Sequence, residues 1–352
     1  MVPVLDADGH VVEAGGLFDR WSPPGSVPLD VPDTTPMVPC GDFDLVADQM
    51  ASGFDAPSYL RALDALGVDA AVVYPSIGLY VPFLPDLAPA ESADACRAYN
   101  DWVAGWCDHA PNRLAAAGLV PLIDPDRAAK EVEHCRHLGL VAVVGRPNHL
   151  YGRNLGDPAY DPIWSTCAEA GIVLAVHEGL GLKGGSTTGM ERFDTFAARH
   201  ACSHPLEQQQ AMASLVFEGA LERHPDLRVA FLESGTGWLP WWLDRLDEHL
   251  AWMAATELSH LSLKPSEYFA RQCIISTEAD DHLVGHAVAS VGADHVAWAS
   301  DYPHPDADFP GAVGEFVTHA RAGGISDDDL ATILWSTPLD FYRLADRIGP
   351  TA

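Results

Sequence analysis

The sequence predicts a (β/α)8 TIM barrel, because three features of the chain agree on that fold. Short apolar runs rich in β-branched residues alternate with longer segments of helical pattern. Eight such runs follow one another with no obvious linker between them. The chain has 352 residues, enough for a barrel of roughly 250 residues with insertions. We therefore expect one domain that spans residues 1–352.

The predicted strands are residues 2–8, 69–76, 113–122, 140–146, 172–178, 227–233, 272–278 and 295–301. Their cores are almost wholly apolar, as expected of parallel strands that are covered on both faces. Helical patterns occupy residues 58–66 and 91–108, and another helix is expected to begin near Pro205. An open, doubly wound sheet is the alternative fold. It is disfavoured because no Gly-x-Gly-x-x-Gly follows the first strand, and the glycines of 179–185 lack the spacing of a phosphate loop.

Two segments do not fit the regular alternation of strands and helices. Residues 11–57, which include Pro23 and Pro24, separate the first strand from its helix, and residues 179–204 follow the fifth strand. Long loops in a compact domain are usually functional. Both follow the carboxyl end of a strand, which is where a barrel enzyme keeps its active site. We expect these two loops to cover that site.

Composition and charge exclude several classes of function. The formal net charge is −30 and only three lysines are present, so a nucleic acid would be repelled. The seven cysteines are scattered and form no Cys-x-x-Cys pair, which argues against a disulfide framework or a zinc knuckle. No apolar run reaches the roughly 18 residues of a membrane span, and the start lacks a signal-peptide pattern. The expectation is a cytoplasmic protein without a membrane partner.

Polar residues end most of the predicted strands. Strands one, five, six, seven and eight each end in a carboxylate or a histidine, and strand four ends in Arg146. These ends share one mouth of a barrel, so the side chains converge although they are far apart in the sequence. Asp8 and His10 lie two residues apart at the end of strand one and project to the same side. On its own this pair is also compatible with a helix-capping Asp and a solvated His.

Together with His177 and Asp301, that pair gives two histidines and two carboxylates. Imidazole and carboxylate ligands without thiolate suit zinc first, with manganese or iron as alternatives. The sequence therefore predicts that Asp8, His10, His177 and Asp301 bind a divalent metal ion.

The chain resembles the amidohydrolase superfamily, and within it the amidohydrolase-2 branch that contains aminocarboxymuconate-semialdehyde, resorcylate and carboxyvanillate decarboxylases. The matching stretches are 5–13 (LDADGHVVE), 157–164 (DPAYDPIW), 176–179 (VHEG), 224–238 (HPDLRVAFLESGTGW), 243–247 (LDRLD) and 299–304 (ASDYPH). The resemblance implies that Asp8, His10, His177 and Asp301 are the metal ligands. Binuclear relatives carry a carbamylated lysine on strand four, where this chain has none, so the resemblance implies one ion. The decarboxylases carry a histidine at the end of strand six, where this chain has Glu233.

We assign catalytic roles to Asp301 and Glu233, each as an acid or base. A structural alternative for Glu233 is a salt bridge to Arg146. Arg146 is expected to bind a substrate carboxylate, because a guanidinium matches it with two hydrogen bonds; a structural arginine is the alternative. His204 and Trp238 are further candidates for substrate binding, with a helix entry and simple packing as their alternatives.

The sequence is compatible with three functions. The first is non-oxidative decarboxylation, a C–C lyase reaction, of a small or aromatic carboxylic acid. The second is hydrolysis of a C–N, C–O or activated C–C bond by metal-activated water. Because Glu233 stands where the decarboxylases have a histidine, hydrolysis ranks only just behind decarboxylation. The third is a non-catalytic, metal-stabilised binding protein. The expected partner is a small-molecule carboxylate, and a homodimer would be typical of the resemblance.

Overall fold

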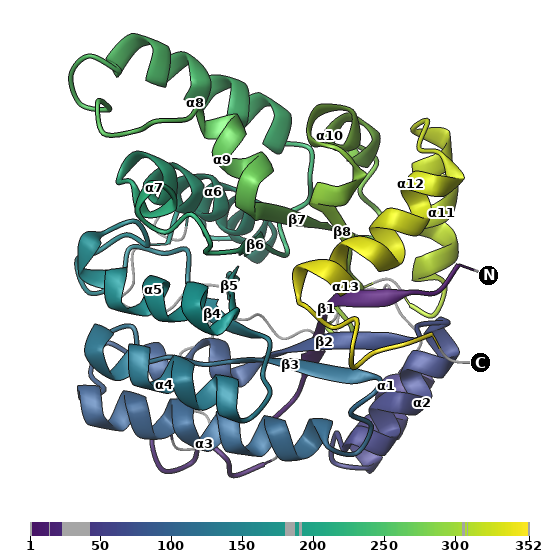
Figure 1. Cartoon of the computed structure of the whole chain (residues 1–352). Coiled ribbons are helices and arrows are strands. Elements are labelled where there is room, and N and C mark those ends of the chain that lie inside the picture. The colour runs from purple at the N-terminus through teal and green to yellow at the C-terminus, as the bar shows by residue number, and fades with distance from the viewer. Residues whose placement is uncertain are drawn as a thin grey trace.

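A computed structural model describes residues 2–13, 15–22, 43–179, 187–189, 192–304, 307 and 309–350. Eight strands form one sheet in which each strand pairs in parallel with the next along the chain (Figure 1). The strands are β1 (Leu5–Val11), β2 (Ala70–Pro75), β3 (Leu114–Gly118), β4 (Ala142–Gly145), β5 (Val173–Val176), β6 (Val229–Phe231), β7 (Cys273–Thr277) and β8 (Val296–Trp298). Seven of them lie inside the runs expected from the sequence, and β1 extends three residues beyond its run.

The sheet closes between its first and last strands. The backbone N–H of Asp301 donates to the carbonyl of Asp8 at 2.9 Å, and that of His10 donates to the carbonyl of Tyr302 at 2.8 Å. Every strand residue is buried, as it must be in a sheet with helices outside and side chains inside. The predicted (β/α)8 barrel is thereby confirmed.

Helices surround the strands (Figure 1). They are α1 (Phe43–Ala51), α2 (Ala56–Leu66), α3 (Pro89–Cys107), α4 (Pro125–His137), α5 (Asp161–Ala170), α6 (Phe196–Phe217), α7 (Ala220–Arg223), α8 (Leu239–Met253), α9 (Pro265–Gln272), α10 (Val284–Val291), α11 (Ala312–Ala322), α12 (Asp327–Ala331) and α13 (Thr337–Phe341). Within the described ranges, no helix is both long and apolar enough to cross a membrane.

Local sequence signals explain where individual helices begin and end. At α2, the side chain of Asp55 accepts a hydrogen bond from the backbone N–H of Ser58, and Pro57 occupies the first turn. The helix ends at Gly67, whose left-handed φ of 74° is accessible to glycine without strain. Asp124 caps α4 in the same way by accepting from the N–H of Arg127. These caps fix the helices that flank β2 and β4.

The helix after β5 begins earlier than the sequence suggests. The prediction placed its start near Pro205, but α6 begins at Phe196 and contains Pro205 in its interior. Proline lacks the N–H that would bond the carbonyl four residues before it, and it is usually found at a helix start. Next to it, the Ser203 hydroxyl donates to the carbonyl of His200 at 3.3 Å. His200 and His204 therefore lie on a helix rather than in a loop.

Both predicted loops lie only partly within the described structure. In the first, α1 and the start of α2 occupy part of residues 43–57, while Pro23 and Pro24 lie outside the described residues. In the second, residues 180–186 lie outside them, and α6 accounts for the end of the segment.

Candidate metal centre and active site

Four buried side chains converge where β1, β5 and β8 end. We call Asp8, His10, His177 and Asp301 the strand-end cluster. Nε2 of His10 lies 3.7 Å from Oδ1 of Asp8 and 3.3 Å from Oδ1 of Asp301. Nε2 of His177 lies 3.3 Å from the same Asp8 oxygen. The four residues predicted as metal ligands are therefore linked through His10: its ligand atom lies within 4.8 Å of those of Asp8 and His177 in one group, and within 4.8 Å of those of Asp301 and His304 in another.

The other nitrogen of each imidazole is held by a backbone carbonyl. Nδ1 of His10 lies 3.1 Å from the carbonyl oxygen of Pro75, and Nδ1 of His177 lies 2.7 Å from that of Glu178. A carbonyl only accepts, so each Nδ1 carries its hydrogen and each Nε2 presents a lone pair. These lone pairs face carboxylate oxygens, and Nε2 of His10 is buried without a hydrogen-bond partner. This is the orientation that metal-binding histidines adopt.

The electrostatics of the cluster keep its ligands in the forms that bind metals. Burial, followed by the nearby His304, lowers the pKa of His10 to about 4, so its imidazole is neutral. Burial alone would raise the pKa of Asp301, but His304 and His10 outweigh it and hold that pKa well below its usual range. Neutral imidazole and ionised carboxylate are the states in which these groups bind a divalent ion. The residues present fit such an ion.

Asp6 is a buried carboxylate that the sequence reasoning missed. Its Oδ1 accepts hydrogen bonds from the backbone N–H of Asp8 at 3.1 Å and of Ser300 at 3.0 Å. Its other oxygen accepts from the Ser300 hydroxyl. Burial raises the pKa of Asp6 to about 7. Asp6 thus joins the strand that carries Asp8 to the segment that carries Asp301. A signal was present, since Asp6 is a third polar residue at alternate positions of an otherwise apolar strand.

His304 is a second residue that the sequence did not single out. Its ring stacks on that of His10, with centroids 3.9 Å apart, and its Nδ1 lies 2.7 Å from Oδ1 of Asp301. Its side chain is 24% exposed, whereas those of His10 and Asp301 are almost fully buried. His304 therefore connects the buried cluster to the surface. His304 is the third residue after Asp301, with a proline between them, and such a spacing in a loop does not predict where the side chain points.

Glu233 ends β6 beside the cluster, and its contacts match the sequence expectation only in part. Its Oε2 lies 3.6 Å from Nδ1 of His177, and its Oε1 lies 3.5 Å from Nε2 of His204. The residue has a left-handed φ of 50°, and its backbone N–H donates to the Ser276 hydroxyl. Such strain in a non-glycine residue is often found at functional sites. The structure thus brings Glu233 and His204 next to His177.

Arg146 was expected to contact a substrate carboxylate or Glu233, but its contacts in the structure are with other groups of the protein. Its guanidinium is fully buried and donates to Asn148 Oδ1 and to the carbonyls of Leu79 and Gly179. Its carboxylate partner is Glu178 at 3.5 Å rather than Glu233. The expected salt bridge between Arg146 and Glu233 is therefore wrong. Because protein acceptors occupy the guanidinium, these contacts favour the structural alternative, in which Arg146 fixes the segments after β2, β4 and β5.

Trp238 lies at the start of α8 and is partly buried, with a buried Nε1 that has no hydrogen-bond partner. Its role in substrate binding stays a prediction. Glu13, at the end of β1, is buried and accepts hydrogen bonds from the backbone N–H groups of Ser76, Ile77 and Gly78. These bonds hold the segment that begins at Pro75, whose carbonyl orients His10.

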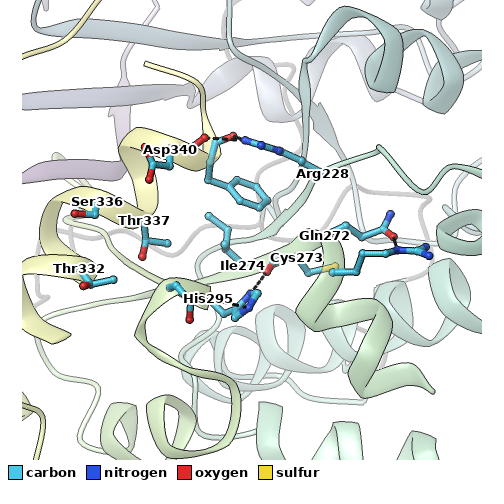
Figure 2. A pocket seen from close by; sticks show the side chains of 12 residues that line it. Arg228, Gln272, Cys273, Ile274, His295, Thr332, Ser336, Thr337 and Asp340 are labelled. Atoms are coloured by element: carbon cyan, nitrogen blue, oxygen red, sulfur yellow. Dashed lines mark hydrogen bonds and ion pairs between the residues drawn. The ribbon is translucent and has the colours of Figure 1, made fainter. Parts of the chain in front are cut away.

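A cavity of about 320 Å³ lies at the opposite end of the barrel, where β6 and β7 begin (Figure 2). The basic side chains that line it contact backbone carbonyls: Arg228 donates to those of Asp340 and Phe341, Arg271 donates to that of Leu221, and Nδ1 of His295 contacts that of Cys273. Among the described residues, the groups able to hold a metal ion all lie at the carboxyl ends of the strands. The candidate metal-binding groups of the described residues therefore lie at that end rather than at this cavity.

Comparison with known proteins agrees with this geometry. The sequence profile of the amidohydrolase family matches residues 5–344. Gamma-resorcylate decarboxylase from Polaromonas is 23% identical over 81% of this chain and 86% of its own length. 2-Amino-3-carboxymuconate-6-semialdehyde decarboxylase from Dictyostelium discoideum is 26% identical over 62% of this chain and 58% of its own length.

Solved structures resemble the whole barrel. The crystal structure of 5-carboxyvanillate decarboxylase from Sphingomonas paucimobilis has a TM-score of 0.74 at 22% identity and covers 97% of this chain and 99% of its own. Dihydroxybenzoic acid decarboxylase from Polaromonas, solved with manganese and the inhibitor 2-nitroresorcinol, has a TM-score of 0.73 at 18% identity, with 98% of each chain covered.

Proposed function

Because the chain belongs to the amidohydrolase family, we propose that it is a metal-dependent decarboxylase of a small or aromatic carboxylic acid. The strand-end cluster carries this proposal. Two imidazole lone pairs and two carboxylates face one another in a buried space, an arrangement that a divalent cation would stabilise. The names of the relatives, which are decarboxylases acting on such acids, support the choice of reaction.

We propose that Asp8, His10, His177 and Asp301 hold one ion. β4 leads into Arg146, with no lysine to bridge a second ion at that place. The ligand types suit zinc, manganese or iron. The residue types favour zinc as the first choice. Manganese is the second choice, and the manganese bound in the Polaromonas decarboxylase supports it. When bound, the ion would supply positive charge that attracts the substrate carboxylate and stabilises negative charge developing as the C–C bond breaks.

The residues of the chain would supply the proton. Loss of CO2 leaves an electron pair on carbon, and that carbon must then accept a proton. Asp301 is the proposed proton-transfer group, and His304, 2.7 Å from it and partly exposed, would exchange protons between Asp301 and solvent. Glu233, beside His177, is the second acid or base candidate.

Hydrolysis by metal-activated water remains the alternative function. The observation that favours it is Glu233 at the end of β6, since the resemblance implies a histidine there in decarboxylases. A carboxylate beside a metal site is suited to accept a proton from water, as a hydrolase requires. Replacing Glu233 by Gln is expected to lower turnover about 100-fold, a typical acid–base contribution, with the ion at the strand-end cluster retained. Unchanged turnover would remove Glu233 from the reaction.

The two reactions can be separated with metal-loaded protein and two substrate panels. One panel holds hydroxylated and aminated aromatic acids, and the other holds amides, esters and lactones. We expect CO2 release from the first panel, and in D2O one deuterium on the carbon that lost CO2. Hydrolysis of the second panel without CO2 release would favour the alternative. His177→Ala should lose both metal and turnover, while His149→Ala, an exposed residue outside the cluster, should keep both.

A further inference from the structure

α8 carries two tryptophans on the face that points into solvent. The helix lies at the outer edge of the barrel and packs against α9 and α10 (Figure 1). Its buried side chains are Leu239, Leu243 and Leu246. On the opposite face, Trp241 is 59% exposed and Trp252 is 76% exposed. Large apolar side chains gathered on one exposed face, unlike those scattered singly, are typical of a protein–protein interaction site.

Two oppositely charged side chains lie between these tryptophans. Arg245 and Glu248 are 50% and 62% exposed, and the Nη1 atom of Arg245 lies 3.5 Å from the Oε2 atom of Glu248. At about 3.6 residues per turn, all four side chains fall on one face of the helix, along a length of about 16 Å. We call Trp241, Arg245, Glu248 and Trp252 the α8 stripe.

The α8 stripe is symmetric about its midpoint, which lies between residues 246 and 247. Trp241 and Trp252 lie at equal distances on either side of this point, and so do Arg245 and Glu248. A second α8 that runs antiparallel across this point would be related to the first by a two-fold axis. Each Trp241 would then lie opposite a Trp252 of the other copy, and each Arg245 would lie level with a Glu248 of the other copy.

This symmetry argues that the stripe contacts a second copy of the same chain. In a two-fold interface the same patch serves both partners, so the patch must be complementary to itself: residue i contacts residue j, and j contacts i. Contact between two stripes would bring each guanidinium next to a carboxylate of the other copy, with a pair of tryptophans at either end. A different protein would need a matching patch of its own, but it would not require this symmetry in α8.

The stripe is presented by a helix that is held firmly to the barrel. The Nε1 atom of Trp242 donates to the carbonyl of Gln209 on α6 at 3.0 Å. The carboxylate of Asp247 accepts from the backbone N–H of Ser266 at 2.9 Å and from its hydroxyl at 2.7 Å, which joins α8 to the start of α9. A surface that is ordered before it binds loses less conformational entropy on association.

Area and charge predict a weak dimer. A tryptophan buries roughly 150–250 Å² in all, and the four of a two-fold contact, which are already partly covered, would bury roughly 500 Å². With their neighbours the total would reach about 1,000 Å², near the lower limit for a specific interface. The net charge of −30 on each chain also opposes association. We therefore expect a dimer that forms at micromolar concentrations and is stabilised by moderate salt, which screens this repulsion.

We propose that two copies of this chain associate in solution through the α8 stripe, with the two α8 helices antiparallel across a two-fold axis. The residues of the stripe belong to none of the candidate metal-binding groups of the described chain. The proposal therefore concerns the assembly of the protein and goes beyond the proposed reaction, so that either can fail without the other.

The test is sedimentation velocity of the full chain over a range of micromolar concentrations, where the unaltered protein should show a reversible monomer–dimer equilibrium. Arg245→Glu would leave four carboxylates at the centre of the contact, and Glu248→Arg would leave four guanidinium groups. Each variant should weaken the dimer by at least about 10-fold. Arg136→Glu is the matched control and should dimerise like the unaltered protein, because Arg136 is an exposed arginine of α4 that pairs with Glu133 three residues away.

An equal mixture of the two charge variants gives the sharpest result. Each chain of one variant then faces opposite charges on the other, so we expect a heterodimer at concentrations where neither variant dimerises alone. Trp252→Ser, which leaves the charges unchanged, should also weaken the dimer by at least about 10-fold. Circular dichroism should first establish that each variant is folded; Trp252→Ser decides alone if a charge variant is not.

Three results would overturn the proposal. If the unaltered chain stays monomeric at every concentration, the contact does not form. If Arg245→Glu and Trp252→Ser dimerise as strongly as Arg136→Glu, the dimer uses another surface. If the mixture of the two charge variants stays monomeric, Arg245 does not lie beside Glu248 of the second copy.

Discussion

Oδ1 of Asp6 accepts hydrogen bonds from the backbone N–H groups of both Asp8 and Ser300, the second of which immediately precedes Asp301. One carboxylate therefore sets the relative positions of two proposed metal ligands on the first and last strands. Groups that orient metal ligands typically affect metal affinity by 10- to 100-fold. We expect Asp6→Asn to keep the fold but weaken binding at the strand-end cluster by about that factor. Titration with Mn²⁺ against a competing chelator would measure it. An unchanged affinity would mean that the backbone alone positions Asp8 and Asp301.

His304 should affect turnover more than metal content. It contacts Asp301 and stacks on His10 at the partly exposed edge of the cluster. If it supplies the proton, His304→Gln should lower kcat by about 100-fold while metal content and KM change little. The pH profile of kcat should also lose one limb in this variant. The matched control is His286→Gln, because among the described residues His286 belongs to none of the side-chain groups that could hold a metal ion. Loss of metal in His304→Gln would instead make His304 a ligand.

Arg146 should prove to be a structural residue. It is buried against Glu178 and three uncharged acceptors. Arg146→Met would leave the Glu178 carboxylate buried without its cation, which typically costs about 3–5 kcal/mol of unfolding free energy. The double variant Arg146→Met, Glu178→Gln should recover part of that loss, as chemical denaturation can determine. A stable single variant with only a raised KM would restore Arg146 as the group that binds a substrate carboxylate.

Gly9 is required by its neighbours rather than by backbone conformation. A Cβ at this position would collide with the hydroxyl of Tyr59 and lie 2.9 Å from Oδ2 of Asp6. We expect Gly9→Ala to lower the unfolding free energy by about 1–3 kcal/mol, the usual cost of overpacking. The Tyr59 hydroxyl is buried without a hydrogen-bond partner, so Tyr59→Phe alone should be nearly neutral. Adding Tyr59→Phe to Gly9→Ala should recover stability. If the double variant is no more stable than Gly9→Ala, the strain lies in the contact between the new Cβ and Asp6 instead.

Glu13 should make stability depend on pH in a defined direction. Burial raises its pKa from the ordinary value of 4.5 to about 7, although backbone N–H groups of Ser76, Ile77 and Gly78 donate to its carboxylate. Between these two values the folded state binds more protons than the unfolded state, so the unfolding free energy falls as pH rises. Metal-free protein should therefore lose stability between pH 4.5 and 7, and Glu13→Gln should lose less over that interval. Denaturant unfolding at several pH values would measure both slopes; equal slopes would contradict this contribution.

Much of the fold could be predicted because strands of a parallel barrel have a strong local signature. The apolar runs that contain β4, β5 and β8 are recognisable without tertiary information, and barrel geometry then places His177 and Asp301 near Asp8 and His10. That rule brings the four residues of the cluster to one end of the barrel. Asp301, however, lies three residues beyond the end of β8 with a left-handed φ of 54°, so its exact position depends on the segment after the strand.

The rest of the site depends on geometry that the sequence does not encode locally. His304 reaches His10 through a loop, where a three-residue spacing has no fixed direction. Pro205 suggested a helix start, so His200 and His204 were not recognised as one helical face. Arg146 was paired with the wrong carboxylate, because Glu178 and Glu233 both end strands and only packing distinguishes them.

The closure of the sheet between β1 and β8 also has a consequence for the order of events during synthesis. Asp8 belongs to the first strand of the barrel, whereas Asp301 and Tyr302, whose carbonyl accepts from the N–H of His10, follow the last strand and are therefore synthesised much later. A nascent chain cannot assemble the strand-end cluster until β8 has been made and has paired with β1. Metal acquisition there would therefore follow translation of nearly the whole barrel, and incomplete chains could not capture the ion with the full ligand set.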